Sequence, residues 1–264
     1  MLTDFGLDDE FVGILHTVIA RIAPGARVVD LTHGVAPHDI RAGALTLWRC
    51  APWLAPGVIL AVVDPGVGTE RRAVAVEVAA AGAVLVGPDN GLLLPALARL
   101  GGPTAAVELP VDPDVPGATF AGRDVFAPAA ARAANGEPLA SLGTPIDPAG
   151  LRGAAVRRAA LDGDGRLRAE VLWVDRFGNA QLNVTPAEAL AALGAVTGAQ
   201  TADGRLCPVD IVGSYGEIAA DRVALVVDSY GLLALSCNRR PAAAQVGVAE
   251  GDPVWLCRDP GQRR

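Results

Sequence analysis

Lysine is absent from this chain of 264 residues, and all 22 basic residues are arginine. We attribute this bias to codon usage, but its chemical consequence holds whatever its origin. The protein has no side chain for Schiff-base chemistry and lacks the lysine of a Walker-type phosphate loop. The basic residues are outnumbered by 29 acidic ones, which gives a net charge of −7. This balance argues against a nucleic-acid partner bound through its phosphates.

Long apolar runs are also absent. The longest, over 58–63 and 79–86, are far shorter than the roughly 20 residues of a membrane-spanning helix. No basic stretch followed by an apolar one opens the sequence, as a secretory signal would. We therefore expect a cytoplasmic protein without a membrane partner. Because 51% of the residues are hydrophobic, the chain is expected to fold around a large core.

Cysteine is scarce and scattered. No Cys-x-x-Cys pair occurs among the four residues Cys50, Cys207, Cys237 and Cys257. This spacing argues against a zinc ribbon and against a disulfide framework. We expect these cysteines to be small buried apolar side chains.

The first part of the chain alternates helical and strand patterns. Apolar residues at helical spacing predict a helix over 11–22. Further helices are expected over 40–50, 92–100 and 125–134, and strands over 27–31, 58–63, 73–78 and 83–86. The alternation predicts an α/β domain over 1–150, with a mostly parallel sheet and flanking helices.

The second part of the chain has a different pattern. Proline, glycine, alanine and arginine dominate 138–165, which we interpret as a linker region. Strands are predicted over 167–174, 223–227 and 232–235, and the residues 228–231 between the last two are typical of a tight hairpin turn. A smaller, β-barrel-like domain is therefore expected over 165–264.

Carboxylates follow several of the apolar runs, namely Asp30, Asp64, Asp89 and Asp175. In open α/β sheets ligands bind beyond the carboxyl ends of the strands, so these residues are expected to converge on one rim. Aspartate also favours turns and helix caps. For any one of these four aspartates taken alone, a turn or a helix cap is the simpler interpretation. The glycine-rich loop 64–72 has no GxGxxG or P-loop pattern, which favours a ligand held without a phosphate site.

A metal site is an alternative. Four acidic residues lie within 3–10, and His33, His38 and Asp39 follow. Histidine and carboxylate ligands suit zinc or manganese. Acidic residues before a helix are also favoured by the helix dipole alone, and the spacing matches no metal motif. We rank a metal-dependent hydrolase below the other interpretations.

Six blocks together resemble the S-adenosylmethionine (SAM) hydroxide adenosyltransferases, SAM hydrolases related to the fluorinating and chlorinating SAM enzymes. The blocks are Thr3-Asp4-Phe5-Gly6, the segment 30–40, Val63-Asp64-Pro65-Gly66-Val67-Gly68-Thr69, Pro88-Asp89-Asn90-Gly91-Leu92-Leu93, the segment 120–128 and Asp175-Arg176-Phe177-Gly178-Asn179. The resemblance implies an α/β domain, a smaller β-barrel domain and a homotrimer with active sites at subunit interfaces. It also implies hydrolysis of SAM to adenosine and L-methionine, without metal or cofactor.

The resemblance assigns roles to residues around the reacting atoms. Asp64 and Arg71 would orient and activate the water. Asp4 would bind the ribose hydroxyls with its two carboxylate oxygens, and His38 would lie against the ribose. The chain begins almost directly at Thr3 and Asp4, which leaves little of a first strand and suggests an N-terminus further upstream.

It also assigns the two ends of the substrate. Asp9 and Asp175 would face the methionine ammonium, and Ser229 its carboxylate. The adenine would be met by the side chains of Phe177 and Asn179 and by backbone at Asn238 and Arg239.

One expected residue is missing. Relatives of this type usually have Phe-His-Gly-Arg-Asp, whereas this chain has Phe120-Ala121-Gly122-Arg123-Asp124. Because alanine can neither accept a proton nor orient water, slow turnover is expected, and a catalytically weakened SAM- or adenosine-binding protein is an alternative. A SAM-dependent halogenase is disfavoured, because such enzymes have tyrosine at the position of Asp64, where a carboxylate repels halide.

Overall fold

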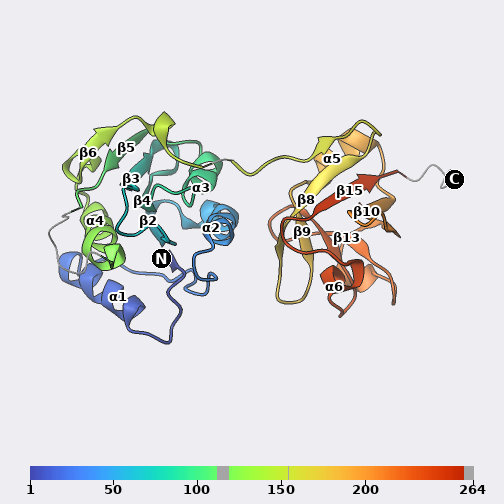
Figure 1. The fold of residues 1–264 in the computed structure, drawn as a ribbon, viewed down its shortest axis with the longest axis horizontal. Helices are drawn as coiled ribbons and strands as arrows, with labels where there is room; N and C mark the ends of the chain where they lie inside the picture. Colours follow the sequence, from blue (N-terminus) through green and yellow to red (C-terminus); the bar gives the residue numbers. More distant parts are fainter. Residues whose placement is uncertain (112–118, 154, 259–264) are drawn as a thin grey trace. The chain divides into compact units, whose positions relative to one another are not determined.

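Two sheets organise the chain in the computed structural model, which describes residues 1–111, 119–153 and 155–258 (Figure 1). The chain divides into two compact units, Met1–Ala155 and Val156–Arg264. Each unit has its own sheet and its own apolar core.

The sheet of the first unit has six strands in the order β1-β2-β4-β3-β5-β6. They are β1 (Leu2–Thr3), β2 (Gly57–Val62), β3 (Ala73–Val78), β4 (Ala83–Pro88), β5 (Ala105–Glu108) and β6 (Thr144–Ile146). Strand β2 is parallel to β1 and β4, whereas the β3–β4, β3–β5 and β5–β6 pairs are antiparallel. The α/β class is confirmed, but the sheet is mixed and not mostly parallel. The short link between β3 and β4, a turn over Ala79–Ala81 followed by Gly82 in the left-handed region, leaves no room for a crossover helix.

Helices cover both faces of this sheet (Figure 1). The helices α2 (Ile40–Leu54) and α3 (Leu94–Arg99) pack on one face, and α1 (Phe11–Ile22) and α4 (Ala127–Ala134) pack on the other. Successive residues of β2 point to opposite faces. Ile59 and Ala61 accordingly join the core under α2 and α3, and Leu60 and Val62 join the core under α1 and α4.

Two sequence predictions in the first unit need correction. The segment 27–31, predicted as a strand, forms no strand, and an isolated bridge joins Leu2 to Thr32 nearby. The reason is that its neighbour β1 is only two residues long. The helix predicted over 125–134 begins earlier, because a π-helical turn over Gly122–Phe126 leads directly into α4.

The second unit contains a nine-stranded sheet. Its strands are β7 (Ala160–Leu161), β8 (Leu167–Val174), β9 (Ala180–Leu182), β10 (Gly198–Thr201), β11 (Leu206–Pro208), β12 (Ile211–Val212), β13 (Ala224–Val227), β14 (Leu233–Ser236) and β15 (Pro253–Cys257). The first half of β8 pairs with β15 and its second half with β9, with an irregularity between Val171 and Trp173. Such a bulge bends a strand, and the sheet curls into a half-barrel, as the β-barrel prediction required (Figure 1).

Two helices, α5 (Pro186–Leu193) and α6 (Ala242–Val246), accompany this sheet. The predicted hairpin is present, since β13 and β14 pair antiparallel across 228–231. None of the helices in the described ranges combines the length and hydropathy needed to cross a bilayer.

Candidate active site

A pocket opens on the first unit at the carboxyl ends of the parallel strands β1 and β2. Asp4 directly follows β1, and Asp64 lies two residues beyond β2. Parallel strands end at the same edge of a sheet, so the two carboxylates line one cavity. Its volume is about 260 Å³, and its wall is formed by Asp4, Phe5, Phe11, Pro37, His38, Val62, Asp64, Val67, Thr119, Phe120, Ala121 and Gly122.

Asp64 and Arg71 form a buried ion pair at this edge. The Arg71 Nε donates to both carboxylate oxygens of Asp64, at 2.8 and 3.0 Å, and its Nη2 donates to Oδ2. The side chains are only 6% and 9% exposed. The guanidinium also lies over the Phe126 ring, 5.1 Å from the ring centroid. Charge-assisted contacts of this kind hold both groups in one geometry, so the carboxylate can position a water molecule in the pocket.

Neighbouring residues hold the loop that carries this pair. Asn90 Nδ2 donates to the Val63 carbonyl at 2.9 Å, directly before Asp64. Thr69 Oγ1 donates to the Gly66 carbonyl at 2.7 Å. A Cβ on Gly66 would lie 3.2 Å from the Cγ of Arg71, so glycine lets the loop close tightly over the arginine.

Asp4 meets His38 at one side of the pocket. The Asp4 Oδ2 accepts a hydrogen bond from the His38 backbone N–H at 2.8 Å. His38 has a φ of 68°, in the left-handed region, which is uncommon for a residue other than glycine. Its side chain is exposed and lines the pocket together with Asp4. Asp9 is exposed and does not line the pocket.

Three phenylalanines also line the pocket. Phe5, Phe11 and Phe120 meet edge to face, with ring centroids 5.1 to 5.9 Å apart. Ala121 lies next to them, 8% exposed. A Cβ on Gly122 would meet Phe120 and Phe5 at 3.0 and 3.2 Å. A side chain at position 122 would therefore crowd these rings, whereas Ala121 lines the pocket.

Of the four aspartates expected to converge on one rim, Asp64 lines this pocket, whereas Asp30 and Asp89 do not. Asp89 is buried and accepts hydrogen bonds from Arg72 Nε at 2.9 Å and from the Arg152 backbone N–H at 2.7 Å. Asp89 therefore holds the backbone at Arg152, near the end of the first unit, against the end of β4. Asp175 belongs to the second unit, and Asp30 lies away from the pocket wall.

The Asp30 carboxylate instead contacts the rings of two histidines. His16 Nε2 lies 2.9 Å from its Oδ2, and His33 Nε2 lies 3.0 Å from its Oδ1. His33 is buried, and its Nδ1 lies 2.8 Å from Thr3 Oγ1. Burial alone would raise the pKa of Asp30, but hydrogen bonds from His33 and His16, with the charges of these rings, outweigh it and lower the pKa.

We expect Asp30→Asn to lower the melting temperature near neutral pH, with a difference that shrinks in acid. The pKa of Asp30 in the folded protein lies below its ordinary value of 3.8. Its contribution to stability is therefore complete above that value and is lost as the pH falls through the folded pKa. Thermal unfolding of both proteins from about pH 7 to about pH 3 measures the effect. A difference that stays constant below about pH 4 would contradict it.

Two of the side chains considered for a metal site have other partners. Asp39 caps α2, accepting from the Ala42 N–H at 2.8 Å, and His33 is engaged with Thr3 and Asp30. Within the described ranges, no group of three or more histidine, cysteine, aspartate or glutamate side chains is arranged to hold a metal ion.

The second unit carries a loop built around Asp175. Its Oδ1 accepts from the backbone N–H groups of Phe177 and Asn179, both at 2.9 Å, and its Oδ2 accepts from Asn179 Nδ2 at 2.8 Å. Gly178 has a φ of 83°, and a Cβ there would clash with Pro241 at 2.4 Å. The tight loop leaves the Phe177 ring 74% exposed, an apolar surface available for stacking on a ligand.

Beside this loop lies a pocket of about 210 Å³. Its wall is formed by Trp173, Asp175, Asn179, Gln181, Tyr215, Val227, Asp228, Ser229, Tyr230 and Ala234. Three of the predicted residues, Asp175, Asn179 and Ser229, therefore lie together. Trp173 and Tyr215 were missed by sequence reasoning. Trp173 precedes Asp175 at the end of a strand, which was a usable signal, whereas nothing in the sequence around Tyr215 indicates a site.

Asn238 and Arg239 lie in a separate hollow. It is lined by Ala220, Asp221, Asn238, Arg239 and Arg240. Asn238 Nδ2 donates to the Ile218 carbonyl at 3.4 Å, and Arg239 has a φ of 57°. These two residues are not part of the pocket that contains Asp175.

Comparison with known proteins places these features in a family. The model of the SAM hydroxide adenosyltransferase N-terminal domain matches residues 1–143, and that of the C-terminal domain matches 169–255. The chain is 46% identical to a protein from Salinispora tropica named (R)-S-adenosyl-L-methionine hydrolase, over 95% of this chain and 94% of that one. It is 41% identical to a protein of the same name from Thermus thermophilus, over 97% of each.

A solved structure shows the same architecture. An uncharacterized conserved protein from Thermotoga maritima is similar with a TM-score of 0.87 and 30% identity, over 97% of this chain and 98% of that one. The family models match parts of both units. The chain therefore belongs to the SAM hydroxide adenosyltransferase family.

Proposed function

We propose that this protein hydrolyses SAM to adenosine and L-methionine, with Asp64 and Arg71 orienting the attacking water. The buried Asp64–Arg71 pair at the edge of the Asp4 pocket is the observation that carries the proposal. The water oxygen forms a bond to C5′ of the ribose as the C5′–S bond breaks. The bonding electrons stay on sulfur, which becomes the neutral thioether of methionine, and one proton is released.

The chemistry suits a site that positions groups and excludes water. SAM has a cationic sulfur and an uncharged leaving group, so in-line attack needs alignment and desolvation more than strong acid catalysis. The three-phenylalanine wall restricts solvent on one side of the pocket. In the same pocket, Asp4 offers carboxylate oxygens to the ribose hydroxyls, and the His38 backbone N–H donates to it.

We assign the remainder of the substrate mainly to residues of the second unit, with Asp9 contributed by the first unit. Asp175, with Asp9, receives the methionine ammonium, and Ser229 receives its carboxylate. The exposed Phe177 ring and the amide of Asn179 suit the adenine, and Asn238 and Arg239 contribute backbone. Because these residues and the Asp4 pocket belong to different units, we propose a homotrimer in which each site is completed by a neighbouring subunit.

Mixing two variants tests this assembly. Asp64→Asn and Asp175→Ala each disable one half of the site. If a site takes its halves from different subunits, mixed trimers contain some intact sites and recover part of the activity. Light scattering gives the oligomeric state of each preparation. A monomer, or a trimer without recovery after proven subunit exchange, would reject shared sites but leave SAM hydrolysis intact.

We expect Asp175→Ala to weaken SAM binding about 10- to 100-fold. The variant loses the hydrogen bonds that hold the loop, and it also loses the charge-assisted hydrogen bond to the methionine ammonium. Titration calorimetry on the Asp64→Asn background, which prevents turnover, measures the affinity. Asp210→Ala is a matched control, since Asp210 is exposed and lies outside the pocket. Equal affinities for the Asp175→Ala variant and this control would remove Asp175 from the substrate site.

The reaction itself is tested with isotopically labelled water. After incubation with SAM, mass spectrometry should find the label in O5′ of adenosine and none in methionine. The relatives' names specify (R)-S-adenosyl-L-methionine, and since methionine and ribose are fixed, we assign (R) to sulfur and propose this epimer as the substrate. Both sulfur epimers are therefore assayed. Formation of adenine, or of a nucleoside without the label, would contradict the proposal.

We further propose that the reaction needs neither metal nor cofactor. Hydrolysis should then continue at the same rate after EDTA treatment and dialysis. Loss of activity that returns with a divalent cation would restore the metal-dependent alternative. A parallel incubation with chloride separates hydrolysis from halogenation, because a halogenase would yield 5′-chloro-5′-deoxyadenosine.

A weakened SAM- or adenosine-binding protein is the second candidate, and one observation favours it. Ala121 lies on the wall of the Asp64 pocket, where relatives supply a histidine. Apart from Asp4, His38 and Asp64, the residues that line this pocket have no ionisable side chain. SAM binding by calorimetry without adenosine release would support this alternative.

A further inference from the structure

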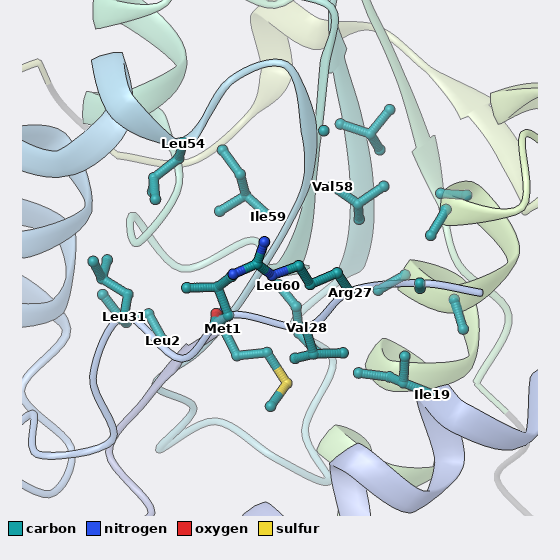
Figure 2. Close-up of a pocket in the computed structure, with 18 of the residues that line it drawn as sticks. Met1, Leu2, Ile19, Arg27, Val28, Leu31, Leu54, Val58, Ile59 and Leu60 are labelled. Atoms are coloured by element: carbon teal, nitrogen blue, oxygen red, sulfur yellow. The ribbon is translucent and has the colours of Figure 1, made fainter. Parts of the chain in front are cut away.

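Two cavities of the protein differ in the chemistry of their walls. The first unit contains one of about 560 Å³ at the start of β2. Figure 2 shows Val58 and Ile59 on one side of it and Met1 and Val28 on the other. Apart from Arg27, its lining side chains are apolar, so they offer few groups that could recognise a particular ligand. The pocket of the second unit, of about 210 Å³, is instead lined mainly by polar and aromatic side chains.

The charges on the wall of this second pocket have one sign. Asp175 and Asp228 line it, and none of the described residues on its wall is basic. Burial raises the pKa of the Tyr215 hydroxyl above its ordinary value, and the charges of both carboxylates raise it further. The side-chain donors on the wall are neutral, namely Trp173, Asn179, Gln181, Tyr215, Ser229 and Tyr230. The pocket therefore favours a cation over an anion.

Asp175 by itself cannot satisfy a substrate ammonium. Its carboxylate already accepts three hydrogen bonds within its own loop, and a carboxylate has about four acceptor positions. About one position therefore remains, whereas an ammonium has three N–H donors. With a second N–H assigned to Asp9, the third still needs an acceptor.

Asp228 fixes the orientation of the Gln181 amide. Its Oδ1 accepts from the backbone N–H groups of Tyr230 and Leu232, at 2.8 and 3.0 Å, which holds the carboxylate in the turn between β13 and β14. Its Oδ2 accepts from Gln181 Nε2. Because an ionised carboxylate only accepts hydrogen bonds, the amide nitrogen is the atom that faces Asp228, and Oε1 is left for another partner.

This Oε1 is a buried acceptor without a donor. Gln181 is 3% exposed, and its Oε1 accepts no hydrogen bond within the described part of the chain. Its neighbours on β9, Ala180 and Leu182, belong to the core of the second unit, so Gln181 points to the other face of the sheet. Trp173 on β8 and Ala234 on β14 lie directly opposite it, and all three line the pocket. Because an unpaired buried acceptor is costly, a ligand that donates a hydrogen bond there is favoured.

We propose that Gln181 Oε1 receives the substrate's ammonium beside Asp175, so that the pocket selects sulfonium nucleosides with a primary amine on the chain attached to sulfur. This assignment rests on the proposed function and adds Gln181 to the residues that bind the methionine end. The α-carboxylate contributes little, because the wall offers it neutral hydrogen bonds and two carboxylates repel it. SAM without its α-carboxylate is therefore a substrate as well.

Three ligands test this selection on the full chain. They are SAM, the analogue without the α-carboxylate and the analogue without the α-amine, and calorimetry on the Asp64→Asn background measures their affinities. Loss of the amine should weaken binding about 100-fold, and loss of the carboxylate no more than about fivefold. The unmodified protein should release adenosine from the carboxylate-free analogue. An amine-free analogue that binds as well as SAM, or a carboxylate-free one that binds about 100-fold more weakly, would overturn the proposal.

Gln181→Met tests the residue itself, because it keeps the length of the side chain and removes the amide. It should weaken SAM and the carboxylate-free analogue about 10-fold each, and the amine-free analogue no more than about twofold. Gln200→Met makes the same change on β10, outside the pocket, and should alter none of the affinities. Equal weakening of all three ligands would mean that Gln181 only holds the Asp228 turn, which refutes its contact with the ammonium.

The two levels of the proposal fail in different ways. Thermal unfolding shows whether Gln181→Met is folded, and the ligand series on the Asp64→Asn background decides the selection even if it is not. A protein that hydrolyses SAM but shows no preference for the amine loses only the ammonium site. A protein that neither binds SAM nor releases adenosine from it loses the proposed function, and the ammonium site with it.

Discussion

Asp64→Asn is expected to lower kcat about 10²- to 10⁴-fold while the Kd for SAM changes by no more than about threefold. The carboxylate is 6% exposed and is held by three contacts from Arg71, so its assigned task is to position water and not to bind the nucleoside. An amide keeps the shape but donates where the carboxylate accepts. The Arg71→Ala variant should follow the same pattern, because it releases the carboxylate.

Steady-state kinetics and calorimetry measure the two quantities separately. Glu70→Gln makes the same chemical change on an exposed side chain of the same loop and should leave both unchanged. Since removing one partner of a buried pair costs about 3–5 kcal/mol, each variant is checked by thermal unfolding before assay. Parallel losses of kcat and affinity in a folded variant would mean that the pair binds substrate instead of orienting water.

Ala121→His is expected to raise kcat about 10²-fold or more, up to the 10⁴-fold range of general acid–base catalysis. Ala121 lines the cavity that also contains Asp64, and that cavity of about 260 Å³ offers room for an imidazole. The new ring would supply a proton acceptor on the wall of the pocket. The gain should titrate with an apparent pKa near that of histidine and should disappear in the Asp64→Asn background.

The same assay on Ala98→His provides the control, since Ala98 is an exposed residue of α3 away from the pocket. If Ala121→His folds and binds SAM but turns over at the unchanged rate, the missing histidine is not what limits this protein. The alternative of a SAM-binding protein would then have to be decided by the labelled-water experiment.

Local patterns predicted many of the longer elements. The apolar stripe over 11–22 and the runs at 58–63, 73–78 and 167–174 correspond to α1, β2, β3 and β8. Such patterns succeed because they depend on side chains within one element. The strand predicted over 27–31 failed for a different reason, since a strand needs a partner, and β1 is too short to provide one.

The sequence by itself determined the chemistry available to this protein. It contains no lysine, has alanine at 121, and carries Asp4, Asp64 and Asp175 in ordered blocks that indicate the family. Only the tertiary structure decided which of these groups meet. Asp4 and Asp64 share a pocket because β1 and β2 are parallel and adjacent, whereas Asp30 and Asp89, equally placed after apolar runs, pair with His16, His33 and Arg72. Strand order and direction arise from contacts between distant segments, and no local pattern records them.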